Sequence, residues 1–181
     1  MGLTILDGTG SGKELKITDD NRATTSSRSS NRSYYISRDD GLLFTFISHD
    51  ATAAAGTQIF YFMNTDTSKN FYVDLIRVGG VETALWKVWF ATGTAAGGSA
   101  ITGANMNSTS GNIQTATTRG NDSITGLSLD RELATVRTPA NTNVDIPFAD
   151  TLIIGTSKAI SVEYDTGTTG IAEVLMRGYY E

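Results

Sequence analysis

Short blocks of β-branched and aromatic residues alternate with long polar stretches along this chain. Within the blocks, apolar and polar residues alternate with a period of two. This pattern predicts β-strands, because successive strand side chains point to opposite faces. The predicted strands and their inward-facing residues are LLFTFIS 42–48 (Leu42, Phe44, Phe46), NFYVDLIRV 70–78 (Phe71, Val73, Leu75), ETALWKVWFAT 82–92 (Ala84, Trp86, Val88, Phe90) and KAISVEYD 158–165 (Ile160, Val162, Tyr164).

Two further blocks are apolar on both sides. QIFYFMN (58–64) predicts a central strand that is covered on both faces, and IAEVLMRGYY (171–180) predicts a C-terminal strand tied into a sheet. Turn signals separate the blocks: Gly79 and Gly80 are expected to turn the chain, and TGTTG (166–170) predicts a hairpin turn before the last strand.

The middle of the chain has weaker patterning. Residues 93–126 predict one or two long loops with edge strands at AIT (100–102) and NIQTAT (112–117). LSLDRELATVRT (127–138) fits either a short helix or a strand, and we favour a strand because the turn-rich connection TPANTNVDIP (138–147) follows it.

These elements predict an all-β fold with a single β-sandwich of jelly-roll type over residues 41–181. Residues 1–40 differ from the rest and predict a polar, extended N-terminal arm with short strands at LTIL and ELKI. The run DDNRATTSSRSSNRS (19–33) has no apolar residue larger than Ala, so it cannot bury a face by itself. Strand propensity resumes at SYYIS (33–37), with Tyr34 and Ile36 on one side.

Charge and composition narrow the function. The chain of 181 residues has a formal net charge of −5 and a pI near 4.8. A nucleic-acid binder needs a basic face that neutralises phosphates, so we expect no nucleic-acid partner. No uninterrupted apolar stretch approaches the length of a membrane span, so we expect no membrane partner. The absence of Cys excludes disulfides and Cys nucleophiles.

Candidate catalytic residues are few. GTGSGK (8–13) resembles a phosphate-binding loop, but Asp7 and Glu14 occupy the positions of its first Gly and its magnesium-binding hydroxyl. His49, the only histidine, lies between Ser48 and Asp50 near a strand end, and strand neighbours point to opposite faces, so these three cannot form a local triad. We therefore predict a non-enzymatic protein without a cofactor.

Two kinds of acidic segment are candidates for a catalytic acid pair or a calcium site. Asp19–Asp20 and Asp39–Asp40 are adjacent acids in polar runs, which is typical of turn and capping residues rather than of a glycosidase pair. NTDTS (64–68) and DTGT (165–168) offer oxygen ligands but lack the ordered acidic spacing of a calcium loop. The prediction is that no metal is bound.

Exposed aromatic residues raise a second class of function. If Trp86 faces the core, Trp89 beside Lys87 points outward, where a ring can stack against a sugar. The alternative, which we favour, is that a neighbouring subunit covers this face. Trp89 is thus a candidate contact residue in either case.

Three segments resemble accessory structural proteins of tailed-bacteriophage virions, most nearly the head decoration (cement) proteins. They are the polar arm NRATTSSRSSNRSYYISRDDG (21–41), the Ala-, Thr- and Gly-rich block WFATGTAAGGSAITG (89–103) and the terminal strand IAEVLMRGYYE (171–181). The resemblance implies a β-rich protein that is made in the host cytoplasm and sits on the outside of the capsid, as a homo-oligomer such as a trimer. The major capsid protein would be its partner.

By the same resemblance, the arm would contact shell subunits or a sister chain. The contact residues that it implies are Arg22, Arg28, Arg32, Tyr34, Tyr35 and Arg38. The alternative function is a carbohydrate-binding jelly-roll module, or a tail or fibre component that recognises a host glycan.

Overall fold

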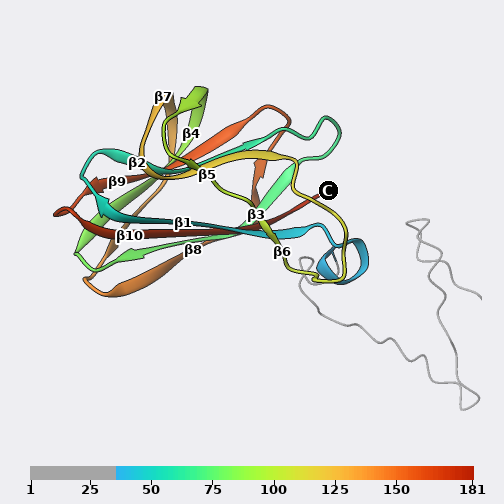
Figure 1. The fold of residues 1–181 in the computed structure, drawn as a ribbon, viewed down its shortest axis with the longest axis horizontal. Coiled ribbons are helices and arrows are strands. Elements are labelled where there is room, and N and C mark those ends of the chain that lie inside the picture. The colour runs from blue at the N-terminus through green and yellow to red at the C-terminus, as the bar shows by residue number, and fades with distance from the viewer. Residues whose placement is uncertain (1–35) are drawn as a thin grey trace, which may run out of the picture. The chain divides into compact units, whose positions relative to one another are not determined.

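The computed structural model describes residues 36–181, apart from the side chains of Arg38, Asp39, Asp122 and Ser123. The described residues fold into ten strands and one π-helical turn (Figure 1). Their bounds are η1 Ile36–Asp40, β1 Leu43–Ala53, β2 Thr57–Asn64, β3 Phe71–Gly80, β4 Ala84–Ala96, β5 Ser99–Ala100, β6 Ala104–Asn105, β7 Ala116–Thr138, β8 Thr142–Ile154, β9 Ala159–Thr166 and β10 Gly170–Tyr180.

The strands form two antiparallel sheets that pack face to face. The first sheet has the order β6-β1-β10-β3-β8, and the second has the order β2-β9-β4-β7-β5. β10 lies between β1 and β3, which confirms that the C-terminal strand is tied into a sheet. The structure therefore confirms the predicted all-β class and the sandwich arrangement. No helix within residues 36–181 has the length and apolarity that a membrane crossing requires.

The core between the sheets is rich in aromatic side chains from both layers. Phe62 has its ring centroid 5.1 Å from Phe46 and 4.5 Å from Phe71. Trp86 packs edge-on against Tyr164 at 5.1 Å. All five side chains are at most 1% exposed, so these contacts lie in the dry interior. The Phe46–Phe62 and Trp86–Tyr164 pairs are edge-to-face, an arrangement that stabilises a core beyond the area that it buries.

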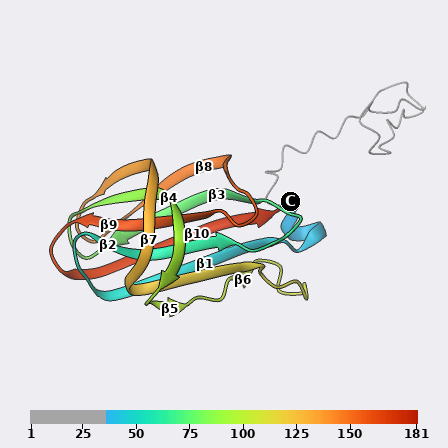
Figure 2. The same cartoon turned by 90° about the horizontal axis from the view of Figure 1, so that it is seen from above.

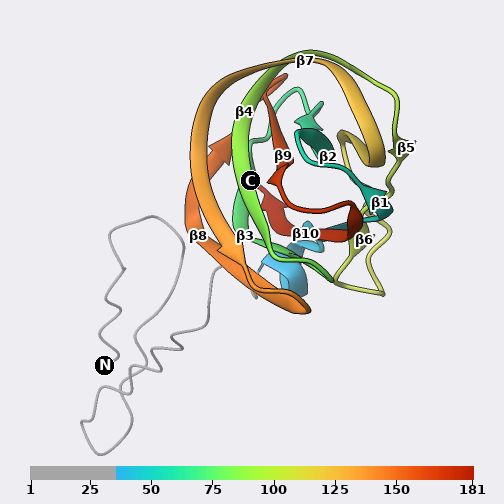
Figure 3. The ribbon, with the colours of Figure 1, turned by 90° about the vertical axis from the view of Figure 1, so that its left-hand side faces the viewer.

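β7 closes the second sheet on itself. Its first half, from Ala116 to Ile124, pairs with β2, and its second half, from Thr125 to Thr138, pairs with β4. Because β9 also joins β2 to β4, these four strands form a continuous ring. Figures 2 and 3 show β7 arching over the other strands of its sheet.

A second small core lies beneath this arch. Tyr61, Ala95, Ile124 and Ala159 are buried together there, with Met63 and Leu127 packed against them. Tyr61 comes from β2, whose Phe60 and Phe62 face the main core. The prediction that this strand is covered on both faces is therefore confirmed.

The inward face of β3 differs from the prediction after Val73. A β-bulge at Asp74 shifts the alternation, so that Leu75 lies on the outer face and Ile76 is fully buried in the core. Asp74 is 9% exposed and accepts a hydrogen bond of 2.7 Å from Nε of Arg177. The inward placement predicted for Leu75 is wrong, because the sequence pattern does not reveal the extra residue.

Three predicted connections are also corrected. Gly79 and Gly80 continue β3 instead of turning the chain. Most of the expected connection 138–147 belongs to β8. This strand can contain Pro147, which has no N–H to donate, because β8 lies at the edge of its sheet. The segment TGTTG joins β9 to β10, which lie in different sheets and do not pair, so it is a crossover rather than a hairpin.

The first described element covers one end of the first sheet. Ile36–Asp40 forms a π-helical turn, so the strand predicted for 33–37 is wrong at Ile36 and Ser37. Ile36 is 7% exposed and packs in a small cluster with Leu43 and Tyr179. This contact fixes the start of the described chain on the sandwich.

Candidate functional site

Most of the predicted arm contacts lie outside the described residues. These are Arg22, Arg28, Arg32, Tyr34 and Tyr35. The backbone of Arg38 belongs to η1, and its side chain is among those not described. The arm therefore remains a prediction, while Trp89 can be examined directly.

Trp89 lies on the outer face of the second sheet, as predicted. Its neighbour Trp86 is fully buried in the core, whereas Trp89 is half-buried. The indole Nε1 of Trp89 donates a hydrogen bond of 2.7 Å to the carboxylate of Glu163 on β9. Nζ of Lys87 lies 5.9 Å from the centroid of the Trp89 ring, which is within the range of a cation–π contact.

Strand pairing brings polar residues from four strands near Trp89. Nζ of Lys87 bonds Asp165 at 2.9 Å, and this hydrogen bond raises the pKa of Lys87, so its ammonium stays charged. In register, Lys87 pairs with Glu163 and Trp89 pairs with Glu132 of β7. Gln58 of β2 pairs with Glu163 from the other side. The group formed by Gln58, Lys87, Trp89, Glu132, Glu163 and Asp165 is called the Trp89 cluster below.

The Trp89 cluster lies at the boundary of the part of the second sheet that is buried beneath the arch of β7. On β9, Ala159 and Ser161 are buried beneath the arch, whereas Glu163 and Asp165 are only half-buried. Trp89 pairs with Ser161, so its ring stands at the boundary between the covered and the open parts of this face. The arrangement places an aromatic ring beside hydrogen-bonding groups at this boundary.

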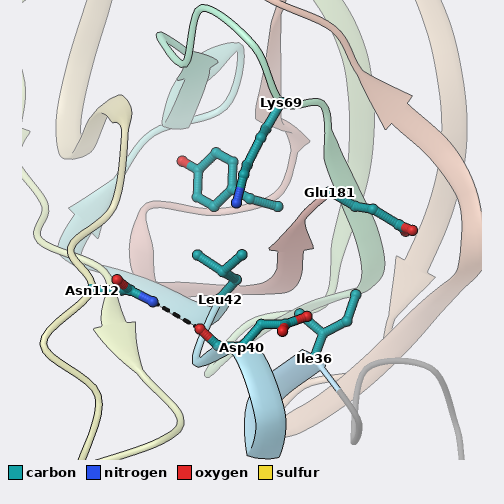
Figure 4. Close-up of a pocket in the computed structure, with 7 residues that line it drawn as sticks. Ile36, Asp40, Leu42, Lys69, Asn112 and Glu181 are labelled. Carbon is teal, nitrogen blue, oxygen red and sulfur yellow. Dashed lines mark hydrogen bonds between the residues drawn. The ribbon is translucent and has the colours of Figure 1, made fainter.

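A hollow with a volume of about 730 Å³ lies at one end of the sandwich (Figure 4). Its lining mixes apolar and charged side chains, with Leu42 between Lys69 on one side and Asp40 on the other. Nδ2 of Asn112 donates a hydrogen bond of 2.8 Å to the backbone carbonyl of Asp40, which ties a loop to η1. The other lining residues are Ile36, Tyr180 and Glu181.

Tyr180 separates this hollow from the core. It is 2% exposed, and burial raises its pKa to about 12. The phenol therefore stays neutral at physiological pH and acts as part of the wall. The hollow is lined by Ile36 and Asp40, at the start of the described chain.

His49 does not form a triad with its neighbours. Its side chain is exposed and lies 3.9 Å from Glu173, whereas Ser48 and Asp50 are each 2% exposed on the opposite face of the strand. Oγ of Ser48 donates to the backbone carbonyl of Ile59, so this hydroxyl has a structural role. The opposite orientation of these neighbours was predicted from strand geometry.

The candidate calcium segment at 64–68 is a structural turn. The carboxylate of Asp66 accepts from the backbone N–H groups of Ser68 and Lys69, both at 2.8 Å, and from the hydroxyl of Thr115. These bonds, led by the one from Ser68, lower the pKa of Asp66 to about 2. Among the described residues, no group of three His, Cys, Asp or Glu side chains is placed to hold a metal ion.

The sequence alone did not identify the acidic members of the Trp89 cluster. Glu163 alternates outward in its strand block, but which strand lies beside it depends on long-range pairing. Glu132 was in a segment that also fitted a helix. Comparison of the chain with protein-family models, curated proteins and solved structures gave no match.

Proposed function

We propose that this protein is a non-enzymatic structural protein of a virion, which binds the outside of a phage capsid lattice and stabilises it. The observation that carries the proposal is the order of the eight long strands, β1-β10-β3-β8 facing β2-β9-β4-β7. This order supports a jelly-roll topology, in which consecutive strands cross repeatedly between two four-stranded sheets. Jelly rolls build virus capsid domains and lectins, so the support for function is fold-level analogy joined to the sequence resemblance.

The position of η1 supports attachment through the N-terminal arm. Ile36, the first described residue, is held against Leu43 and Tyr179. An arm that orders only on an assembled lattice would distinguish that lattice from free subunits, because the cost of ordering is met by contacts that exist only there. In a trimer, three arms binding together would strengthen weak individual contacts.

Deletion of residues 1–32 tests this attachment. The truncated protein is expected to keep the circular dichroism spectrum and cooperative unfolding of the full chain, because the sandwich begins beyond the deletion. It is expected to lose co-sedimentation with capsids assembled from the major capsid protein. A matched full-length variant, Ile47→Ser, changes an exposed side chain on the first sheet and should still co-sediment. Equal attachment by the truncated protein would contradict the proposed role of the arm.

Copy number in purified particles tests the location. Quantitative mass spectrometry should find this protein in amounts comparable to the major capsid protein. A few copies per particle would instead place it in the tail or neck, and complete absence would overturn a virion role.

The second candidate function is a carbohydrate-binding module, or a tail or fibre component that recognises a host glycan. The specific observation that favours it is the half-buried ring of Trp89, held by Glu163 among polar side chains on an outer face.

A further inference from the structure

We propose that the Trp89 cluster is a binding site for neutral oligosaccharides. The inference deepens the second candidate function by naming the site and the chemical class of its ligand, and it rests on that candidate rather than on capsid attachment.

The first argument is the fixed aromatic ring. Trp89 has two side-chain torsions, and the 2.7 Å bond from its Nε1 to Glu163 restrains both. A ring held in this way loses little conformational freedom when a ligand arrives. Nζ of Lys87 lies over one face of the ring, so the C–H groups of a pyranose ring would stack on the other face.

The second argument is the set of hydrogen-bonding groups beside the ring. A carboxylate oxygen has more than one lone pair, so Glu163 and Asp165 can accept from sugar hydroxyls while they keep their bonds to Trp89 and Lys87. The ammonium of Lys87 offers three N–H donors. Hydroxyl groups both donate and accept, so a sugar can use both kinds of partner at once.

The third argument is charge. The cluster carries the carboxylates of Glu132, Glu163 and Asp165 against the single ammonium of Lys87, and Lys87 is already paired with Asp165. A sialylated, sulfated or uronic-acid sugar would bring a further negative charge to this surface and be repelled. The charge balance therefore selects neutral hexoses and N-acetylhexosamines.

The fourth argument is the shape of the surface. Beside Trp89 the outer face changes from buried at Ser161 to half-open at Glu163, and both residues are on the same strand. A sugar ring that stacks on the tryptophan would therefore lie toward Glu163 rather than toward Ser161. The rest of the chain of sugars can extend over the open part of the sheet, toward Gln58 and Asp165.

Tryptophan fluorescence offers a selective test, because the chain has two tryptophans and only one of them can meet a ligand. Trp86 is fully buried, so a sugar-induced change in emission reports on Trp89. The full-length protein should be titrated with cellobiose, maltose, lactose and chitobiose, and with sialyllactose as the anionic comparison. We expect a saturable change with at least one neutral sugar and a weaker response to sialyllactose.

Variants then locate the site. Trp89→Ala should lower the affinity for the responding sugar by about tenfold or more, measured by calorimetry because the reporter is lost. Glu163→Gln keeps an oxygen that can accept from Trp89, so it tests the carboxylate while the fold is kept. It should lower affinity without changing the melting temperature by more than a few degrees. The control Ile47→Ser, on the other sheet, should bind as the unchanged protein does.

The outcomes separate the site from the function. Sugar binding that survives Trp89→Ala would overturn this site while keeping a carbohydrate-binding function. Preference for sialyllactose would overturn the neutral class of ligand. No response to any of these sugars, by fluorescence or calorimetry, would overturn both the site and the second candidate function.

Discussion

The indole Nε1 of Trp86 donates a hydrogen bond of 2.9 Å to Oγ1 of Thr138, and neither residue has any exposed surface. The two residues lie on neighbouring strands, β4 and β7, so the bond ties the end of the long strand to the core. A buried N–H group that loses its acceptor keeps the full cost of leaving water.

Thr138→Val is therefore expected to destabilise the protein by about 1–3 kcal/mol, because it keeps the shape of the side chain but removes the acceptor. Urea unfolding followed by circular dichroism measures the change. Thr125→Val makes the same replacement at an exposed position of β7 and should shift the free energy of unfolding by less than about 0.5 kcal/mol. Equal effects of the two variants would contradict a role for this bond.

The two arginine–aspartate pairs of the first sheet should differ in strength. Arg177 bonds Asp74 at 2.6 and 2.7 Å, and the Asp74 side chain is 11% exposed. Arg77 bonds Asp145 at 2.6 and 3.0 Å, but both side chains are nearly half exposed. Removing the partner of a buried carboxylate costs more than removing that of an exposed one.

Arg177→Gln is expected to lower the free energy of unfolding by about 2 kcal/mol. Arg77→Gln should lower it by clearly less. Both changes remove one positive charge from the same face, so the comparison controls for net charge. A larger loss from Arg77→Gln would show that burial of Asp74 does not govern the difference.

Gly178 is needed for a close approach between β10 and β3. A Cβ atom at this position would lie 2.3 Å from the backbone oxygen of Tyr72 and 2.5 Å from the ring of Phe71. Gly178→Ala should therefore destabilise the protein by about 1–3 kcal/mol through overpacking. Gly111→Ala, where no atom lies within 4 Å of the added Cβ, should change stability by less than about 1 kcal/mol. Thermal melts of the two variants make the comparison.

Acid stability should depend on Asp66. Its pKa falls from 3.8 to about 2 in the folded state, so the folded protein binds fewer protons than the unfolded chain in this range. The stabilisation is present above pH 3.8 and is lost as the pH falls toward 2. Asp66→Asn should therefore flatten the dependence of unfolding free energy on pH across this window.

Chemical unfolding at a series of pH values measures that slope. Thr115→Val removes one hydroxyl donor and keeps the bonds from Ser68 and Lys69, so it should retain most of the slope. Asp145, whose pKa is lowered by its hydrogen bond to Arg77, supplies part of the remaining slope in every variant. An unchanged slope in Asp66→Asn would contradict the role of this turn.

Local alternation in the sequence predicted the strands that have a clear inner and outer face. Phe44 and Phe46 in β1 and Val162 in β9 lie inward as expected, because period-two patterning directly encodes which side is buried. The same alternation placed Trp86 inward and Trp89 outward on β4.

Departures from the prediction arise where backbone geometry overrides alternation. The bulge at Asp74 changes the inward face of β3, and positive φ angles at Ala149 (45°) and Asp150 (66°) let β8 bulge beyond Pro147 and still rejoin β3. The Trp89 cluster required pairings among β2, β4, β7 and β9, which join residues far apart in the chain. Patterning within one segment carries no information about such pairings.

The ring of β2, β9, β4 and β7 also decides where another polypeptide could add a strand. Each long strand of that ring has a neighbour on both sides, so its backbone groups are already used. In the first sheet, β8 is a terminal strand, and there Pro147 lacks an N–H while Asp145 adds charge. β8 is thus protected against edge-to-edge aggregation, whereas at the opposite edge of this sheet the two-residue strand β6 covers only Phe44 and Thr45 of β1, so a strand added from another polypeptide would have to pair with the rest of β1.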